Sequence, residues 1–297
     1  MIGANIGTKS GWLKYKSTPD RSRKLLSEKL LAIEQNTYRE KLRMAVLYKQ
    51  SLKTIQSKIA ELYADYGDKI ESGQFYNYNR LKTLENQILR EIKRLNGEMI
   101  DKTKNTVAGA YEQGYLRTGQ IYEQTIGSSL GFGLLNPKQI EAAVFRVPYE
   151  IRWDKRMTHN HEVYARQVKE SVVKGIQQGK GYSQIAKDVK DRAEIGKNKT
   201  LRIVKTETHR AVEQGTIQAY DKVTESAQEL GLATRKKWMA TLDSRTRDSH
   251  VFMDGQMADE AGMFYVNGIP TEAPGMTGDA GEDINCRCTT ILEIIGL

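Results

Sequence analysis

The residues best suited to chemistry lie in the last sixty positions of the chain. Both cysteines of the protein, Cys286 and Cys288, stand there two residues apart, and His250 precedes them. In an extended chain, residues i and i+2 point to the same side, so both thiols can meet one histidine. Two thiolates and an imidazole, with a carboxylate or water in the fourth place, can bind zinc tetrahedrally. One interpretation of this segment is therefore a zinc site at His250, Cys286 and Cys288.

The second interpretation is a clasp without a cofactor. Structural zinc sites usually have four Cys or His ligands, with the cysteines separated by at least two residues, and only three ligands are offered here. The same side chains could instead form a hydrogen-bonded, tightly packed knot that ties a loop to a strand. The predicted structural clasp consists of Trp238, Asp243, Arg247, His250, Asn285, Cys286 and Cys288.

A third hypothesis, from another class, is a metal-dependent hydrolase or nuclease, or a DNA-binding protein, that uses Asp243, His250, Cys286 and Cys288. The sequence has neither a nucleophile elbow with a Ser/His/Asp order nor a His-Glu-x-x-His motif. His159 and His161 spell His-Asn-His in one tripeptide, whereas a nuclease needs such residues dispersed around a metal. We interpret His209, on a predicted helix, as a partly buried polar contact. We therefore expect that the protein is not an enzyme.

Short elements must bring the clasp residues together. The run 236–241 predicts a strand, after which Asp243 is placed to cap a helix over about residues 244–252. Asn267-Gly268 between apolar residues is typical of a two-residue hairpin turn of type I′. A loop rich in Gly, Pro and acidic residues follows, over 270–283, and the apolar run 289–295 predicts the last strand. The C-terminal segment is thus expected to be a small α+β module.

The rest of the chain has the pattern of a helical scaffold. Spacings of three and four between apolar residues predict two long helices that fold back as an antiparallel hairpin. These residues are Tyr48, Leu52, Ile55, Ile59, Leu62 and Tyr66 in one helix, and Leu81, Leu84, Ile88, Ile92, Leu95 and Met99 in the other. Further helices are expected over about 154–178, from Ser183 through Lys190, and over about 199–229. The predicted fold class is mainly α, with a long helical hairpin, a helical body and the small C-terminal α+β module.

The distribution of charge along the chain follows the same division into a helical part and a C-terminal module. Residues 1–150 carry 24 Lys and Arg against 16 Asp and Glu, and residues 151–235 carry 17 against 11, whereas residues 236–297 carry 5 against 10. We predict four parts: an extended N-terminal arm (1–21), a helical hairpin with its connector (22–150), a helical body (151–235) and the C-terminal α+β module (236–297). A basic body is therefore joined to an acidic module.

The basic charge has two interpretations. Charge runs usually serve as solvated helix surface, but they can also contact nucleic acid or an acidic ring of proteins. A candidate contact patch consists of Lys9, Lys14, Lys16, Arg21, Arg23 and Lys24. No nucleic-acid fold motif accompanies it. No apolar run approaches the roughly 18 to 20 residues of a membrane span, so we expect no membrane partner. No secretory signal is evident, so we expect the protein to be made and to work in a reducing cytoplasm.

The C-terminal pattern resembles a known family, the phage Mu F-like minor head proteins, also called phage head morphogenesis proteins. The resemblance rests on Trp238, the motif Asp243-x-x-x-Arg247-x-x-His250, Asp254-Gly255, Phe264, Asn267-Gly268, Pro270 and Asn285-Cys286-Arg287-Cys288. It extends back to about residue 180, because the segment 205–215 is similar to the helical half of the family. The ordered set is far more specific than any one of its pieces.

The resemblance implies a viral structural protein, a minor capsid component at the portal vertex of a tailed bacteriophage, acting in head morphogenesis and virion assembly. Its expected partners are the portal protein and capsid or scaffold proteins, with several copies around the portal and with double-stranded DNA as a further contact during packaging or ejection. The expected location is the virion, assembled in the cytoplasm of the bacterial host. Some relatives carry a toxin or ADP-ribosyltransferase domain after the motif. Nine residues follow Cys288, so we expect no such domain here.

Overall fold

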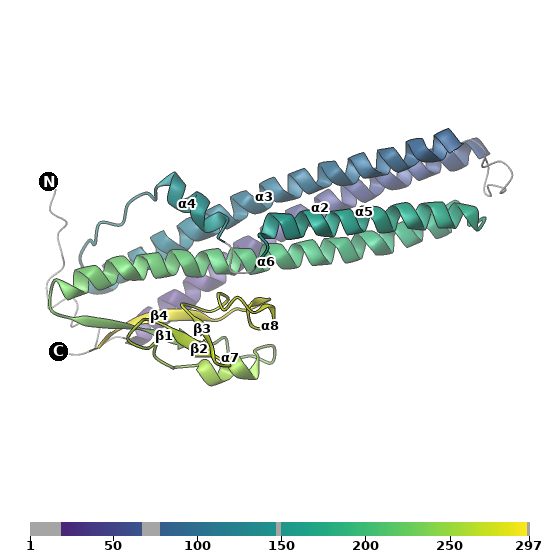
Figure 1. The fold of residues 1–297 in the computed structure, drawn as a ribbon. Helices are drawn as coiled ribbons and strands as arrows, with labels where there is room; N and C mark the ends of the chain where they lie inside the picture. Colours follow the sequence, from purple (N-terminus) through teal and green to yellow (C-terminus); the bar gives the residue numbers. More distant parts are fainter. Residues whose placement is uncertain (1–18, 67–77, 147–149, 296–297) are drawn as a thin grey trace. The chain divides into compact units, whose positions relative to one another are not determined.

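The fold is mainly α-helical, as predicted, with a few short strands near the C-terminus (Figure 1). The computed structural model describes residues 19–66, 78–146 and 150–295. Its helices are α2 (Pro19–Tyr66), α3 (Tyr78–Ile126), α4 (Pro137–Val144), α5 (Trp153–Gln177), α6 (Tyr182–Gln228), α7 (Asp248–Met253) and α8 (Ala280–Asp283). Its strands are β1 (Ala233–Met239), β2 (Phe264–Val266), β3 (Ile269–Thr271) and β4 (Thr289–Ile295). Among the described helices, none combines the length and the apolar character that a membrane crossing needs.

The chain forms two compact units that interleave along the sequence. The first, here called the terminal unit, contains the described parts of Met1–Tyr38, Asn105–Glu150 and Lys205–Leu297. The second, here called the helical unit, contains the described parts of Arg39–Lys104 and Ile151–Val204. Because α2, α3 and α6 each cross from one range to another, each of these helices contributes a segment to both units.

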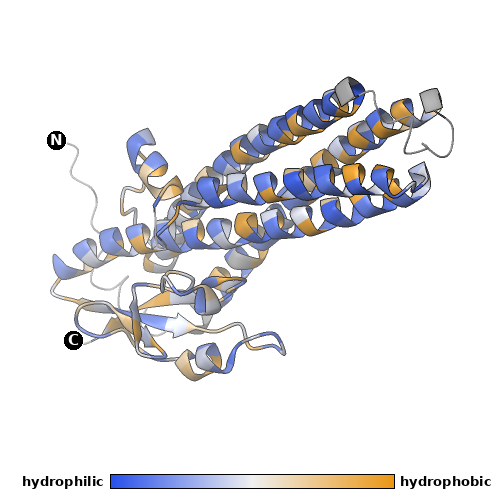
Figure 2. Ribbon diagram, turned by 45° about the vertical axis from the view of Figure 1, so that its right-hand side comes forward, coloured by the Kyte–Doolittle hydropathy of each residue, from blue (hydrophilic) through white to orange (hydrophobic). Residues whose placement is uncertain are grey.

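The helical unit has the seam that the spacing of apolar residues predicts. Ile55 and Ile59 of α2 are buried, as are Ile88 and Leu95 of α3. The two helices run side by side in opposite directions within this unit, and hydrophilic residues cover their other faces (Figure 2). The predicted helical hairpin is therefore confirmed. The side chain of Tyr66, the last residue of the predicted first seam, lies outside the described set.

Helix α6 differs from the prediction, because one helix of 47 residues replaces the two expected ones. A buried stripe continues through the predicted gap, and its members are small or polar: Ala193 and Thr200 are buried, and Gly196 packs against Tyr164 of α5. A Cβ added at Gly196 would lie 3.2 Å from the Tyr164 ring. A stripe of small side chains can be buried against a neighbouring helix as an apolar stripe is. It is not recognised in the sequence, because its residues are not strongly apolar.

In the terminal unit, α3 and α6 approach so closely that their backbones touch. A Cβ added at Gly114 would overlap the carbonyl oxygen of Val212, and one added at Gly215 would overlap that of Tyr111. The contact is reciprocal, with one glycine on each helix. Only residues without a side chain permit this separation of the helices.

The strands form two small antiparallel pairs, β1 with β4 and β2 with β3. Asn267 and Gly268 both have positive φ, 49° and 79°, which confirms the predicted type I′ hairpin turn. Tyr122 of α3 and Tyr220 of α6 donate hydrogen bonds to the carbonyl oxygens of Leu292 and Thr290, at 3.0 and 2.7 Å. The sheet of β1 and β4 is thus fastened to both helices through β4.

The helix contact gives a first testable prediction. Gly114→Ala and Gly215→Ala should each destabilise the protein by roughly 1 to 3 kcal/mol, because the added methyl group forces the helices apart. Urea denaturation of each purified variant measures the change.

Gly97→Ala and Gly109→Ala are matched controls on α3, since nothing lies within 4 Å of a Cβ added at either position. They should stabilise the protein by up to about 1 kcal/mol, because alanine favours helix more than glycine does. Equal effects at all four glycines would contradict the close helix contact.

Candidate functional site

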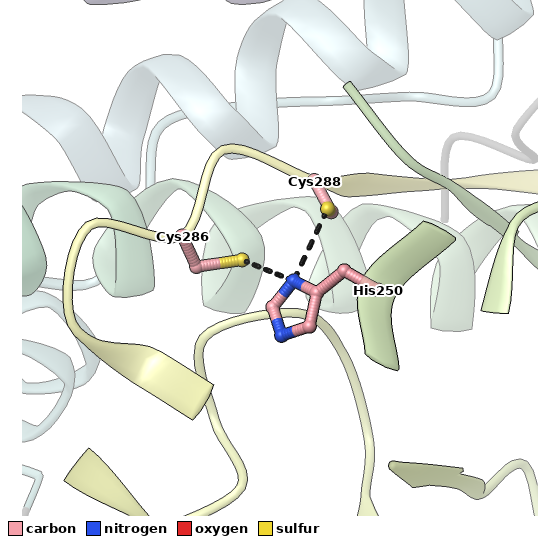
Figure 3. Close-up of side chains that lie close together, drawn as sticks. All are labelled: His250, Cys286 and Cys288. Carbon is pink, nitrogen blue, oxygen red and sulfur yellow. Dashed lines mark hydrogen bonds between the residues drawn. The ribbon is translucent and has the colours of Figure 1, made fainter. Parts of the chain in front are cut away.

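The two cysteines and His250 meet in the interior of the terminal unit. Nδ1 of His250 lies 3.4 Å from Sγ of Cys288 and 3.6 Å from Sγ of Cys286. Figure 3 shows both sulfur atoms directed at this one ring nitrogen. The three side chains are at most 3% exposed. The expected convergence of the i and i+2 thiols on one histidine is therefore present in the structure.

The other nitrogen of the His250 ring faces a carboxylate. Nε2 lies 3.0 Å from Oε2 of Glu282. Glu282 is itself held by two donors, since Ser249 Oγ donates to Oε2 at 2.8 Å and Asn267 Nδ2 donates to Oε1 at 2.9 Å. The contact is close, but Nε2 makes no hydrogen bond of good geometry among the described residues, so the position of the ring proton does not follow from it.

Trp238 forms the apolar wall of the cluster. Its side chain is fully buried, and its ring meets those of His250 and Phe264 edge to face, with centroids 5.7 and 5.3 Å apart. It belongs to one buried cluster together with both cysteines. Packing of this kind holds the histidine and thiols in a water-poor environment.

Asp243 does not have the predicted capping role. Helix α7 begins at Asp248, its N-cap is Arg247, and no side chain caps it. Asp243 instead accepts from the Arg245 amide at 2.8 Å and binds Arg287 through both carboxylate oxygens, at 2.5 and 2.6 Å. The Arg287 guanidinium holds the pKa of Asp243 well below its usual range. A bidentate arginine outcompetes a helix terminus because both partners are ionised and two parallel hydrogen bonds form.

Two further clasp residues act through the backbone. Arg247 Nη2 donates to the carbonyl oxygen of Ile284 at 2.5 Å, which ties the start of α7 to the segment before the cysteines. Asn285 is exposed and has a φ of 61°, so it turns the chain into the cysteine segment. Asp243 and Asn285 therefore lie outside the buried cluster that they were expected to share with the thiols.

A buried ion-pair network on α6 holds the loop before the cysteines. Arg210 binds Glu207, its Nε donates to the carbonyl oxygen of Gly275 at 3.2 Å, and its Nη2 lies 3.8 Å from Asp283. Asp283 in turn accepts from Thr277 Oγ1 at 2.7 Å. Sequence reasoning missed this network, because Asp283 is far from Glu207 and Arg210 in the chain and the two helix residues resemble a solvated ion pair.

His209 of α6 also lies beside this loop. Its Nε2 is buried and has no hydrogen-bond partner among the described residues. A Cβ added at Gly275 would lie 3.4 Å from this nitrogen and 3.8 Å from Cβ of Cys286, so the ring edge adjoins the cysteine segment. Burial lowers the pKa of His209 to about 3, which keeps the imidazole neutral. His209 is partly buried, as expected, but its Nε2 makes no polar contact among the described residues.

A second buried polar group lies where α2, α3 and α6 meet in the terminal unit. Lys29 Nζ donates to Thr118 Oγ1 at 2.6 Å and to Thr216 Oγ1 at 3.0 Å. Glu213 accepts from Thr289 Oγ1 at 2.8 Å. Burial lowers the pKa of Lys29 to about 8 and raises that of Glu213 to about 7.

Among the remaining candidates from the sequence, none whose side chain the structure describes is part of the site. In the predicted basic patch, Lys9, Lys14 and Lys16 lie outside the described residues, Arg21 and Arg23 fall within α2, and Lys24 is exposed. Helix α2 begins at Pro19, within the last three positions of the predicted arm.

The His-Asn-His tripeptide is a packing feature of the helical unit. His161 is buried and bound by Tyr48 Oη at 2.7 Å and by the carbonyl oxygen of Met157 at 2.9 Å. Burial lowers its pKa to about 4. His159 is exposed on the other side of the helix. The two histidines therefore do not share a site.

Residues 166–291 match the family described as Phage Mu protein F like protein. The matched region contains α6, the buried cluster and most of the terminal strands. This part of the chain is therefore a phage Mu F-like region, and the predicted resemblance to phage minor head proteins is confirmed.

Two relatives extend the likeness to most of the chain. The minor head protein GP7 of Bacillus phage SPP1 is 27% identical over 257 residues, which are 86% of this chain and 82% of GP7. The NAD(+)-arginine ADP-ribosyltransferase EFV of Enterococcus faecalis is 31% identical over 272 residues, which are 91% of this chain and 55% of that protein. This chain thus spans little more than half the length of the Enterococcus relative. No solved structure matches it.

Removal of Arg210 tests the buried ion-pair network. Arg210→Met should lower the free energy of unfolding by roughly 3 to 5 kcal/mol, because Glu207 and Asp283 would remain buried without their cation. Guanidinium denaturation measures the loss, and Arg202→Met, at an exposed position of the same helix, is the control and should change it little. A small effect of Arg210→Met would show that the loop does not depend on this arginine.

The buried carboxyl of Glu213 should make stability depend on pH. Its pKa is raised from 4.5 to about 7, so the folded state holds the proton more tightly and stability is lost as pH rises through this window. Lys29 stays protonated there in both states, because its folded pKa is about 8. Glu213→Gln should remove this dependence, which amounts to at most about 1.4 kcal/mol per pH unit.

Urea denaturation of both proteins between about pH 5 and pH 7 provides the measurement, and the difference between them cancels most other titrating groups. A difference that stays constant across this range would show that Glu213 does not titrate there.

Proposed function

We propose that the chain is a minor head protein of a tailed bacteriophage that associates with the portal vertex in several copies and acts in head morphogenesis. The observation that carries this proposal is the phage Mu F-like region, together with a relative named as a minor head protein whose length is mostly covered. Other capsid or scaffold proteins would be further partners. The protein would be assembled into the head in the host cytoplasm and remain in the virion.

A non-catalytic role is part of the proposal. The cluster of His250, Cys286 and Cys288, on which a hydrolase or nuclease would depend, is at most 3% exposed. A hydrolytic site must admit both substrate and water. Burial to this extent supports a structural use of the three side chains.

The transferase activity in the name of the Enterococcus relative belongs to that protein. Because this chain spans 55% of that relative, we do not extend the activity to it. Incubation of the purified chain with NAD as ADP-ribose donor and an arginine-containing acceptor tests the point, with nicotinamide release as the readout. Release above that of a heat-denatured sample would contradict the non-catalytic role.

The distribution of charge supports an acidic partner for the helical unit. This unit carries 27 Lys and Arg against 15 Asp and Glu, whereas the terminal unit carries 19 against 22. The whole positive excess thus lies in the helical unit. A positive helical surface attracts acidic protein surfaces and the phosphates of packaged DNA alike.

A groove on the helical unit offers a specific contact for the portal protein. It has a volume of about 770 Å³ and lies between α2 and α6. Leu42 and Val46, each 51% exposed, contribute apolar surface. Four lysines and one glutamate, which pairs with Lys197, line the groove: Lys49, Lys53, Lys190, Lys197 and Glu194. Apolar surface flanked by positive charge fits an acidic amphipathic segment of the portal protein.

Co-elution with the purified portal oligomer of the same phage tests this function. We expect the full chain to bind in several copies, and Val46→Glu to weaken binding about tenfold or more, because it places a charge in the apolar part of the groove. Leu89→Glu is the matched control, since Leu89 is 40% exposed on α3 of the same unit but does not line the groove. Absence of portal binding at both low and high salt would refute the proposed function.

The same binding assay with duplex DNA in place of the portal oligomer distinguishes a portal-binding protein from a free DNA-binding protein. Such a protein would bind plain duplex with a steep dependence on salt. Tight duplex binding together with no portal binding would favour that alternative.

A further inference from the structure

We propose that the terminal unit binds a structural zinc ion through Sγ of Cys286, Sγ of Cys288 and Nδ1 of His250, with Nε2 of His209 as the fourth ligand. All four side chains lie within the phage Mu F-like region. The inference is independent of the portal association, because it concerns only the interior of this unit.

The spacing of the three clustered atoms fits a tetrahedral zinc ion. Zinc bonds of about 2.3 Å to sulfur and about 2.0 Å to nitrogen, at tetrahedral angles, place each sulfur roughly 3.5 Å from the nitrogen. The observed distances from His250 Nδ1 are 3.4 Å to Cys288 and 3.6 Å to Cys286. All three ligand atoms lie within 4.8 Å of one another. The ligands are therefore already positioned around a common centre.

Hydrogen bonding alone satisfies this arrangement poorly. A neutral His250 ring with its proton on Nε2 offers one lone pair at Nδ1, the atom at which two sulfur atoms are directed (Figure 3). One lone pair can accept from only one of the two thiols, and the other thiol is left to hydrogen-bond to the neighbouring sulfur. A metal ion at the centre would bind the lone pair and both sulfurs at once, and thiolates with an imidazole favour zinc over harder cations.

Glu282 completes the pattern expected around a metal-binding histidine. Such a histidine usually donates its second ring N–H to a carboxylate, which fixes the ring and strengthens the ligand. His250 Nε2 lies 3.0 Å from Glu282 Oε2, and that carboxylate is held in place by Ser249 and Asn267. A histidine that only fills a core has no need of so well fixed a carboxylate.

His209 supplies the remaining ligand. Its Nε2 is buried without a partner among the described residues and borders the cysteine segment across Gly275. It lies outside the group of three atoms that are within 4.8 Å of one another, so coordination requires the ring to move closer to the thiols. Gly275 has a φ of 75° and no side chain, so space for the His209 ring is kept open beside Cys286. Coordination would satisfy this orphaned nitrogen and close the site to water. The ion would then join α6, α7 and the cysteine segment inside one unit.

Metal analysis of the full chain tests the site. Protein purified without chelators should contain about one zinc per chain, and cobalt substituted for zinc should give the absorption of thiolate ligands in a tetrahedral field. Cys286→Ser, Cys288→Ser and His209→Gln should each lose most of this binding. Glu282→Gln should weaken zinc affinity about 10- to 100-fold, because it alters the ligand's hydrogen-bond partner.

Two exposed positions provide controls. His159→Gln and Glu260→Gln remove a histidine and a carboxylate away from the cluster and should leave metal content and cobalt spectrum unchanged. Cobalt titration of the folded wild-type chain keeps the test valid if a cysteine variant does not fold. A wild-type chain that takes up neither zinc nor cobalt would overturn the site, and a cobalt spectrum unchanged in His209→Gln would overturn the fourth ligand.

Discussion

The terminal unit depends on the contact between the backbones of α3 and α6. Gly114 and Gly215 each accept the opposite helix where any side chain would collide with it. At this separation Thr118 and Thr216 can share the ammonium group of Lys29. The same separation lets Tyr122 and Tyr220 reach successive parts of β4. The absence of a side chain at these two glycines thus permits the close helix packing against which the C-terminal strands lie.

From that frame, α6 positions the cysteine segment through charge rather than apolar packing. Arg210 donates a hydrogen bond to the carbonyl oxygen of Gly275 and lies near Asp283. Asp283 accepts a hydrogen bond from Thr277 of the same loop. The loop then enters the cysteine segment after the left-handed turn at Asn285. Buried charges of this kind are costly unless all are paired, so they specify one loop conformation and penalise others.

The sequence predicted features that local rules determine. The 3.6-residue period gave the hairpin of α2 and α3, the Asn-Gly pair gave the turn between β2 and β3, and the i, i+2 spacing gave the convergence of the thiols. Features that depend on distant partners were missed. Asp243 has a capping sequence but binds Arg287, 44 positions away, and the stripe of α6 is continuous only because Ala193, Gly196 and Thr200 meet neighbours that suit small side chains. Local propensity is a weak guide wherever a tertiary partner decides.

The burial of both thiols has a consequence for oxidation between copies of the chain. The sequence contains no other cysteine, and Cys286 and Cys288 are 3% and 2% exposed. Disulfides between neighbouring copies can then form only after the terminal unit opens, because thiol exchange requires direct access to sulfur. An oxidising environment after cell lysis would therefore leave intact copies unlinked. Any disulfide-linked dimer would therefore indicate that the terminal unit of the linked chains had unfolded.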